Sequence, residues 1–174
     1  RVKGTPAEGK TSFHFMDYRD LEGKYDAVVS IEMFEAVGES YWPSYFRTVA
    51  NSLRPGGKAA IQTITIANER FDDYRRGTDF IQQYIFPGGM LPSPQRFEQE
   101  IRKADLHVDN MFGFGMDYAR TLRLWRENFE ARLDEVMQQG FDDAFVRLWR
   151  FYYCYCEAGF LTRRTDVYQA LVTR

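Results

Sequence analysis

Short apolar runs alternate with an amphipathic stretch in the first half of the chain. Residues 25–31, "YDAVVSI", form a β-branched run typical of a strand buried on both faces. Residues 40–53 repeat apolar side chains at helical spacing, and "RPGG" at 54–57 ends that helix because Pro and Gly cannot continue it. Residues 58–66 return as a strand, and the alternation over 12–16 predicts an earlier one. This order predicts an α/β fold with an open, mostly parallel sheet.

Longer helices dominate the predicted second half. Ser93-Pro94 opens a helix that runs to about residue 104, after a Pro/Gly-rich loop. Residues 106–115 predict a strand, and 165–174 predict a closing strand. Between them, one apolar stripe covers 118–139 and ends at Gly140, and a second covers 141–160. No linker divides these elements, so the pattern predicts one domain over all 174 residues.

Composition narrows the class of protein. The net charge of -2 and the pI of about 5.8 argue against a general nucleic-acid binder. Cys154 and Cys156 stand one residue apart without a CxxC pair or a His cluster, so we predict no metal site and a reducing, intracellular setting. No run reaches the roughly 18 apolar residues of a membrane span. The first ten residues contain neither an initiator Met nor an apolar signal core, and resemble the inside of a domain.

Polar side chains follow the predicted strands, at the sheet edge where ligands bind in open α/β folds. Glu32 and Glu35 flank the apolar Met33 and Phe34. Apolar surroundings disfavour the ionised form of a carboxylate, which suits proton chemistry. The alternative is that a Glu near a helix start complements the helix dipole.

Gln62 and the acids Asp17 and Asp20 are further candidates for contact with a ligand, and each also has a purely structural interpretation. Gln62 lies in a strand of Ala, Ile and Thr, and its amide needs partners, which are either a ligand or other core groups. Asp17 and Asp20 are either ligand contacts or ordinary loop residues.

Five segments together resemble the cyclopropane-fatty-acyl-phospholipid synthases. They are "DYRD" (17–20), "YDAVVSIEMFEAVG" (25–38), "LRPGG" (53–57), "ERFDDYRRGTDFIQQYIFPGGMLPS" (69–93) and "YCEAGF" (155–160). "MFEAVG" and "YIFPGGMLPS" are the most specific of these. The resemblance runs from about residue 12 to the end and implies a Rossmann-like S-adenosylmethionine-dependent methyltransferase. It implies a strand order of 3-2-1-4-5-7-6, with helical lipid-binding insertions at about 69–105 and 118–160.

The resemblance also implies a reaction. S-adenosylmethionine donates a methylene to the cis double bond of an unsaturated phospholipid acyl chain, through a carbocation, and bound bicarbonate removes the proton that lets a cyclopropane ring close. Glu35, the backbone of Ile64 and Tyr118 match the residues that hold bicarbonate. Gln62 stands where many bacterial members carry His, and Ala36 stands where His usually follows the motif Glu.

Three more positions follow from the resemblance. Asp17, with Tyr18 beside it, is expected near the adenine of the cofactor. Cys156 matches a cysteine once regarded as catalytic, although no activating cation adjoins it in sequence and a structural role is favoured. Glu32 receives no role.

One expected motif is absent from the sequence. No Gly-rich cofactor turn precedes "DYRD", and the strands numbered 1 and 2 in the implied order are missing. We therefore expect the chain as given to bind cofactor poorly and to be inactive alone. Unpaired strand edges favour a homodimer.

Two alternatives remain open. One is a fatty-acid or small-amine methyltransferase that closes no ring, and the other is a non-catalytic fragment that binds lipid or a partner. For a phospholipid enzyme we expect a cytoplasmic protein peripheral to the inner face of the membrane. Arg120, Arg123 and Arg126 would then meet anionic headgroups.

Overall fold

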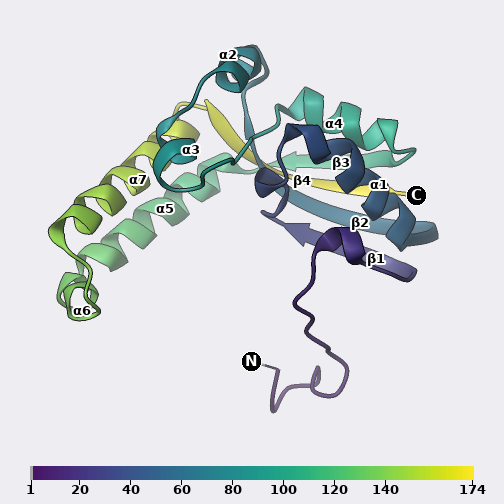
Figure 1. Ribbon diagram of the computed structural model, residues 1–174, viewed down its shortest axis with the longest axis horizontal. Helices are drawn as coiled ribbons and strands as arrows, with labels where there is room; N and C mark the ends of the chain where they lie inside the picture. The colour runs from purple at the N-terminus through teal and green to yellow at the C-terminus, as the bar shows by residue number, and fades with distance from the viewer. Residues whose placement is uncertain (1) are drawn as a thin grey trace.

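A four-stranded sheet organises the computed structural model, which describes residues 2–174 (Figure 1). The strands lie in the order β1-β2-β4-β3. β1 pairs parallel with β2, whereas β4 runs antiparallel to both β2 and β3. Three strands therefore point the same way, as the mostly parallel α/β prediction requires, and β4 alone is reversed. The strands are β1 (Tyr25–Ile31), β2 (Leu53–Ile66), β3 (His107–Gly113) and β4 (Thr165–Thr173).

The strand predictions hold except at two places. β2 begins five residues before the predicted start at 58, because "RPGG" is absorbed into the strand where its register with β1 shifts. Gly57 permits this, since a Cβ there would lie 2.9 Å from the carbonyl oxygen of Arg54. The predicted strand over 12–16 is wrong: these residues are exposed and irregular. In the described chain no neighbouring strand offers them ladder partners.

Two helices cover one face of the sheet. α1 (Trp42–Ser52) and α4 (Pro94–Lys103) lie side by side over it (Figure 1). Alternate residues of β2 face them, and Ala59 and Ile61 are fully buried in the resulting core. Pro43 opens α1 and Ser93 caps α4, as the sequence indicated for α4.

β1 is an edge strand in the described part of the chain. Val29 is 68% exposed and Ile31 is 54% exposed, so the predicted burial of this strand on both faces is wrong. The physical reason is that only β2 pairs with it, and α1 and α4 cover the face to which Val28 points.

The remaining long helices form an arm beside the sheet. α5 (Gly115–Glu130) and α7 (Asp143–Leu161) pack along each other, joined by α6 (Leu133–Gln138) (Figure 1). The predicted single helix over 118–139 is wrong, because Arg132 leaves the helical conformation and breaks it. Arg123 and Arg126 both pair with Glu157 of α7, at 2.8 and 3.4 Å. These two arginines therefore link α5 to α7 beside the apolar cluster that Ala119 and Leu122 form with Phe160.

Short helices fill the connections. They are η1 (Tyr18–Asp20), η2 (Phe34–Ala36), η3 (Glu39–Tyr41), η4 (Asn68–Arg70), α2 (Phe71–Arg76) and α3 (Phe80–Tyr84). The region predicted as a helical insertion over 69–105 thus contains the end of η4, the short helices α2 and α3, and then α4, which belongs to the layer over the sheet.

Candidate active site

A difference in length between two neighbouring strands creates the site. Ile31, the last residue of β1, pairs with Gln62, and β2 then continues to Ile66 without β1 beside it. The N–H groups of this overhang need other acceptors. Ile64 donates to the Glu35 carboxylate, and Ile66 donates to the carbonyl of Pro92. The free edge of β2 therefore donates hydrogen bonds to the Glu35 side chain and to the loop at Pro92, where it would normally pair with further residues of β1.

Phe34 anchors the segment that follows β1. Its ring is fully buried and lies 4.9 to 5.4 Å, centroid to centroid, from the rings of Trp42, Tyr45, Phe46 and Phe97. This packing fixes η2 and turns the next side chain, Glu35, back toward β2. Met90 donates its N–H to the Glu35 carbonyl at 2.8 Å, which fixes the backbone as well.

The Glu35 carboxyl group is part-buried against β2. Its Oε1 accepts from the Ile64 N–H at 2.6 Å, and its Oε2 is buried without a hydrogen-bond partner among the described residues. Burial raises the pKa of Glu35 above its ordinary value, and the Ile64 N–H opposes that rise. Burial therefore disfavours the ionised form of this carboxyl group, while the partner that the structure gives it is polar, the Ile64 N–H.

Glu32 received no role from the sequence, but it is the centre of a group of polar contacts at the end of β1. We call this group the rim; it consists of Glu32, Gln62, Tyr118 and Gln169. Glu32 Oε1 accepts from the Gln62 amide at 2.8 Å and Glu32 Oε2 accepts from the Tyr118 hydroxyl at 2.9 Å. Gln169 of β4 donates to the Gln62 amide oxygen at 2.9 Å, so both ends of that amide have protein partners. Burial, then the nearby Glu32 carboxylate, raises the pKa of Tyr118.

The backbone of Glu32 is also unusual. Its φ of +50° lies in the left-handed region that favours glycine. The sequence held a signal for this residue: a Glu directly after the last apolar residue of a strand, with a Gln on the next strand. Only the register of β1 against β2 shows that the two side chains meet.

The predicted bicarbonate ligands do not fit that anion. The residues expected to hold it are Glu35, the Ile64 backbone and Tyr118. The Ile64 N–H already donates to Glu35, and the Tyr118 hydroxyl already donates to Glu32. Gln62, which stands where many members carry His, also donates to Glu32. A second anion about 4 Å from a carboxylate is repelled by roughly 4 kcal/mol at an effective dielectric constant of about 20. We therefore derive no step through bicarbonate.

Cys156 lies in the apolar cluster beneath α5. It packs there beside Tyr118, Phe160 and Val167. Burial raises the pKa of its thiol to about 12, so the thiol is neutral near pH 7. The structure places Cys156 close to the rim but gives it no nucleophilic character.

Asp17 and Tyr18 lie near the same strand. Tyr18 packs edge-on against Tyr45 with ring centroids 5.7 Å apart, and Tyr45 donates to Ser30 of β1 at 2.7 Å. The Asp17 carboxylate accepts from the backbone and guanidinium of Arg19, which lowers the pKa of Asp17 to about 2. No hydrogen bond of the described residues joins Asp17 or Tyr18 to the rim around Glu32.

An exposed carboxylate and an aromatic ring are groups that suit an adenine amine and its ring, and the contact of Asp17 and Tyr18 with the cofactor stays a prediction. The Asp17–Arg19 ion pair is exposed, and such a pair rearranges at little cost. The aromatic ring of Tyr18 is half-buried beside it.

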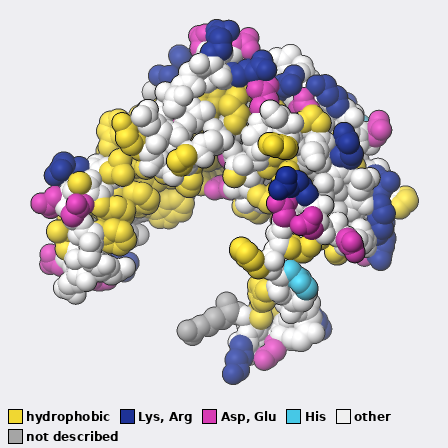
Figure 2. Space-filling model, in the orientation of Figure 1, with side chains coloured by type: hydrophobic (Ala, Val, Ile, Leu, Met, Phe, Trp, Pro, Cys, Tyr) yellow, Lys and Arg dark blue, Asp and Glu magenta, His cyan; other side chains and the backbone are white. Residues whose placement is uncertain are grey.

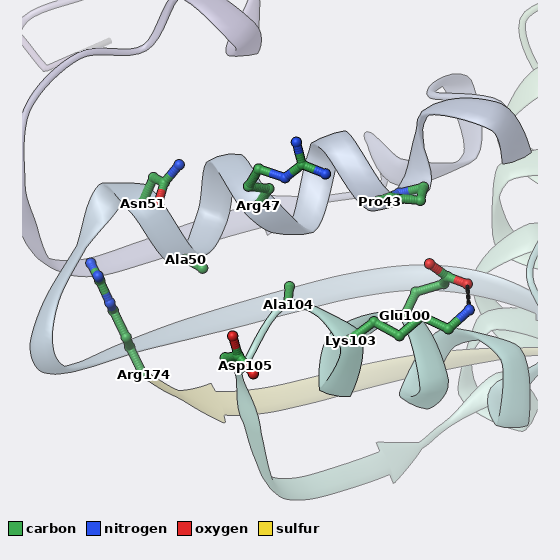
Figure 3. A pocket seen from close by; sticks show the side chains of 9 residues that line it. All are labelled: Pro43, Arg47, Ala50, Asn51, Glu100, Lys103, Ala104, Asp105 and Arg174. Atoms are coloured by element: carbon green, nitrogen blue, oxygen red, sulfur yellow. Dashed lines mark hydrogen bonds and ion pairs between the residues drawn. The ribbon is translucent and has the colours of Figure 1, made fainter.

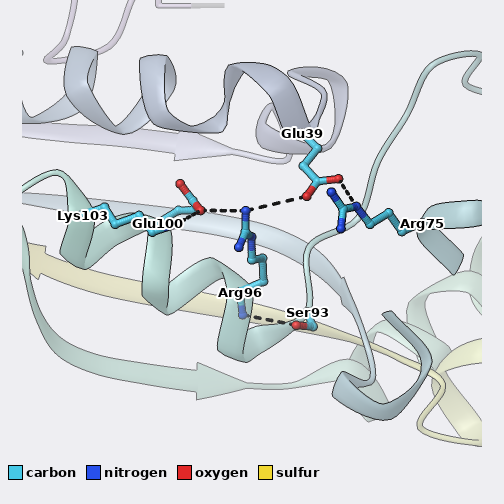
Figure 4. A network of polar contacts seen from close by, with 6 residues as sticks. All are labelled: Glu39, Arg75, Ser93, Arg96, Glu100 and Lys103. Atoms are coloured by element: carbon cyan, nitrogen blue, oxygen red, sulfur yellow. Dashed lines mark hydrogen bonds and ion pairs between the residues drawn. The ribbon is translucent and has the colours of Figure 1, made fainter. Parts of the chain in front are cut away.

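A chain of ion pairs holds the loop after η2. Glu39 pairs with Arg75 at 2.7 Å and with Arg96 at 3.7 Å. Arg96 also pairs with Glu100 at 3.2 Å, and Glu100 pairs with Lys103 at 2.8 Å (Figure 4). These pairs connect α2 and α4 with η3. They fix the far end of the loop that carries the two site glutamates.

A separate hollow lies between α1 and α4 (Figure 3). Arg47 and Asn51 line it from α1, and Glu100 and Lys103 line it from α4. Glu100 Oε1 already pairs with Lys103 at 2.8 Å, and no contact joins the described lining residues to Glu32 or Glu35. The hollow therefore lies beside the ion pairs of α4 and is separate from the site of the two glutamates.

Two searches of residues 2–174 complete the description. No three or more His, Cys, Asp or Glu side chains there are grouped as metal ligands would be. No helix in that part of the chain is long and apolar enough to cross a membrane.

Comparison with known proteins gives a consistent family. The model of the family described as mycolic acid cyclopropane synthetase matches residues 1–170. The chain is 46% identical, over its whole length, to tuberculostearic acid methyltransferase UfaA1 of Mycobacterium tuberculosis. It is 32% identical, over 91% of its length, to the cyclopropane-fatty-acyl-phospholipid synthase of Escherichia coli K12. It spans 41% and 40% of the lengths of these two relatives.

A solved structure confirms the fold. The crystal structure of mycolic acid cyclopropane synthase CmaA1, complexed with SAH and CTAB, superposes with a TM-score of 0.82 at 23% identity. The match covers 90% of this chain and 58% of the other. The observed order β1-β2-β4-β3 corresponds to the 4-5-7-6 part of the implied methyltransferase order.

Proposed function

This chain belongs to the mycolic acid cyclopropane synthetase family, and on that premise we propose that it is the catalytic part of an S-adenosylmethionine-dependent lipid methyltransferase. Its substrate is the cis double bond of an unsaturated phospholipid acyl chain, and its product carries a cyclopropane ring. The observation that carries the proposal is the pair of carboxyl groups, Glu32 and Glu35, at the end of β1.

The chemistry of the rim suits this reaction. S-adenosylmethionine, when bound, supplies an electrophilic methyl group. Transfer of that group to an alkene leaves a positive charge on carbon, which the carboxylate at the rim stabilises. A neutral Cys156 thiol does not compete as a nucleophile for the methyl group. Asp17 and Tyr18 are the residues that would hold the adenine.

Exposed apolar side chains support an acyl-chain substrate. Figure 2 shows hydrophobic side chains gathered on the α5–α7 arm around the hollow beneath the sheet. Leu124 and Trp125 of α5 and Phe151 and Tyr155 of α7 are between 38% and 53% exposed. Burying an aliphatic chain against them gains roughly 25 cal/mol for each Å² of apolar surface removed from water. We propose that the lipid reaches this surface from a membrane to which the protein binds peripherally.

A second product deserves a separate assay. The chain is more similar to a tuberculostearic acid methyltransferase, at 46% identity, than to the phospholipid cyclopropane synthase, at 32%. That difference favours methylation of an unsaturated chain without ring closure. Both reactions use the same rim and the same surface, and they differ in the proton that is removed.

Product analysis tests the function. The protein at its natural length is incubated with S-adenosylmethionine and vesicles of dioleoyl phospholipid, with distearoyl phospholipid as the saturated control. A product that gains one CH2 and loses its double bond supports ring formation. The same gain with the double bond retained supports the second candidate. No lipid product, together with no S-adenosylmethionine binding by calorimetry, refutes the proposal and favours a non-catalytic role.

A further inference from the structure

We propose that Glu32 is a built-in general base in this site and occupies the position that an exogenous anion would otherwise take. The inference rests on the proposed function and names the group that receives the proton. It starts from an observation at the rim: the Tyr118 hydroxyl, which was expected to hold an anion there, and the neighbouring Gln62 amide both donate to the carboxylate of Glu32.

The contacts fix this carboxylate as an acceptor. One donor approaches each of its oxygens, at 2.8 and 2.9 Å. A Glu carboxylate and a small carboxylate-like anion present the same planar pair of oxygens, so the same two donors suit either one. Gln169 holds the other end of the Gln62 amide, and therefore the amide nitrogen faces Glu32. Donors arranged in advance around a carboxylate are typical of an organised catalytic group.

The backbone gives a second, independent observation. Glu32 has a φ of +50°, which is strained for a non-glycine residue and persists where surrounding contacts hold it in place. This conformation places the Glu32 carboxylate between Gln62 and Tyr118, which come from β2 and α5.

Glu32 suits the role of base better than Glu35. Glu32 is exposed at the rim, where a substrate reaches it. Glu35 has one oxygen occupied by the Ile64 N–H and the other sealed from solvent. Glu35 is therefore a positioning residue, which fixes the segment that carries Glu32 onto the free edge of β2.

The proposed proton transfer needs no group other than Glu32 and the lipid. A Glu32 oxygen accepts a proton from the transferred carbon, so that an O–H bond forms and a C–H bond breaks. The electron pair of that C–H bond forms the last C–C bond of the ring and neutralises the positive charge on carbon. Glu32 becomes a neutral carboxylic acid and returns its proton to solvent at the exposed rim. If the proton leaves a neighbouring chain carbon, the same step retains a double bond and closes no ring.

Two substitutions at one position test the proposal. Glu32→Gly removes the carboxylate and leaves room for a small anion, and φ of +50° suits glycine. Glu32→Gln keeps the shape of the side chain without the base. Glu98→Gln is the matched control, because the pair that Glu98 makes among residues 2–174 is an exposed one with Arg102 on α4. Circular dichroism checks the folding of each variant, and all assays use the protein at its natural length.

Activity gives the first readout. The wild type is expected to keep its rate in buffer freed of CO2, and both Glu32 variants are expected to lose about 10²-fold or more. Added bicarbonate or formate should restore part of the activity of Glu32→Gly but none of Glu32→Gln. A wild-type enzyme that needs added bicarbonate, or a Glu32→Gly variant with the wild-type rate, overturns the proposal.

Anion binding gives a readout that does not depend on turnover. Line broadening of [13C]bicarbonate is expected with Glu32→Gly and absent with the wild type and Glu32→Gln. Equal broadening with the wild type and Glu32→Gly overturns the proposal even if the enzyme is active. If the wild type transfers no methyl group at all, the proposed function and the base role fail together, while broadening confined to Glu32→Gly still supports the anion position of Glu32.

Discussion

Phe34→Ala is expected to destabilise the protein strongly, although Phe34 itself touches no reacting group. The ring is 0% exposed and contacts four aromatic rings at centroid distances of 4.9 to 5.4 Å. Truncating a buried Phe to Ala costs about 3–5 kcal/mol through lost transfer free energy and the cavity left behind. Each aromatic pair adds roughly 0.5–1.5 kcal/mol beyond its buried area, so we expect about 4 kcal/mol or more here.

Urea unfolding followed by far-UV circular dichroism measures this change in the free energy of unfolding. Phe86→Ala is the matched control: Phe86 is 58% exposed, and its loss is expected to cost less than about 1 kcal/mol. Phe34→Leu should cost about 1–2 kcal/mol because most of the volume remains. If Phe34→Ala cost below about 1.5 kcal/mol, the cluster around Phe34 would not be the anchor that fixes η2 and the Glu35 side chain.

Three further predictions concern single side chains. Because the pKa of Glu35 is raised on folding, its contribution to stability should be fully present below the ordinary value of 4.5 and be lost as pH rises through the raised value. Urea midpoints of Glu35→Gln across that range should lack this part of the pH dependence, and a pH dependence equal to that of the wild type would contradict the raised pKa. Iodoacetamide at pH 8 should label the exposed Cys154 much faster than Cys156, because the Cys156 pKa of about 12 leaves about one thiolate in 10⁴ thiols. Equal labelling of the two cysteines, followed by peptide mass spectrometry, would contradict the burial of Cys156. Gly115→Ala should lower the free energy of unfolding by about 1–3 kcal/mol, because the added Cβ would lie 2.5 Å from Asp166 Oδ1. Gly77→Ala is the control, since the nearest atom to its Cβ would lie 3.5 Å away. Equal melting temperatures for the two variants would contradict the clash.

The sequence predicted the elements better than the site. Strands over 25–31 and 165–174 follow from local apolar patterns, and both are present. The interruption of the long helix at Arg132 and the missing strand over 12–16 depend on packing and pairing, which a local pattern does not contain.

The site shows the same division. A disfavoured ionised form of Glu35 was expected from its neighbours, and burial does raise its pKa, although the partner in the structure is the polar Ile64 N–H. The contacts of Glu32 with Gln62 and Tyr118 span 30 and 86 positions, and they depend on strand register and on where α5 lies. A single sequence does not encode such distances in any local pattern. The roles of Glu35, Gln62, Ile64, Tyr118 and Cys156 in catalysis remain predictions.

The early end of β1 has a consequence for how this protein can evolve. The Ile64 N–H reaches Glu35 only because β1 stops beside Gln62. Two residues inserted into β1 would extend the ladder, occupy that donor and displace the glutamates from the edge. We therefore expect families built on this scaffold to diversify by substitution at positions such as Glu32, while insertions and deletions between Tyr25 and Glu35 are eliminated by selection.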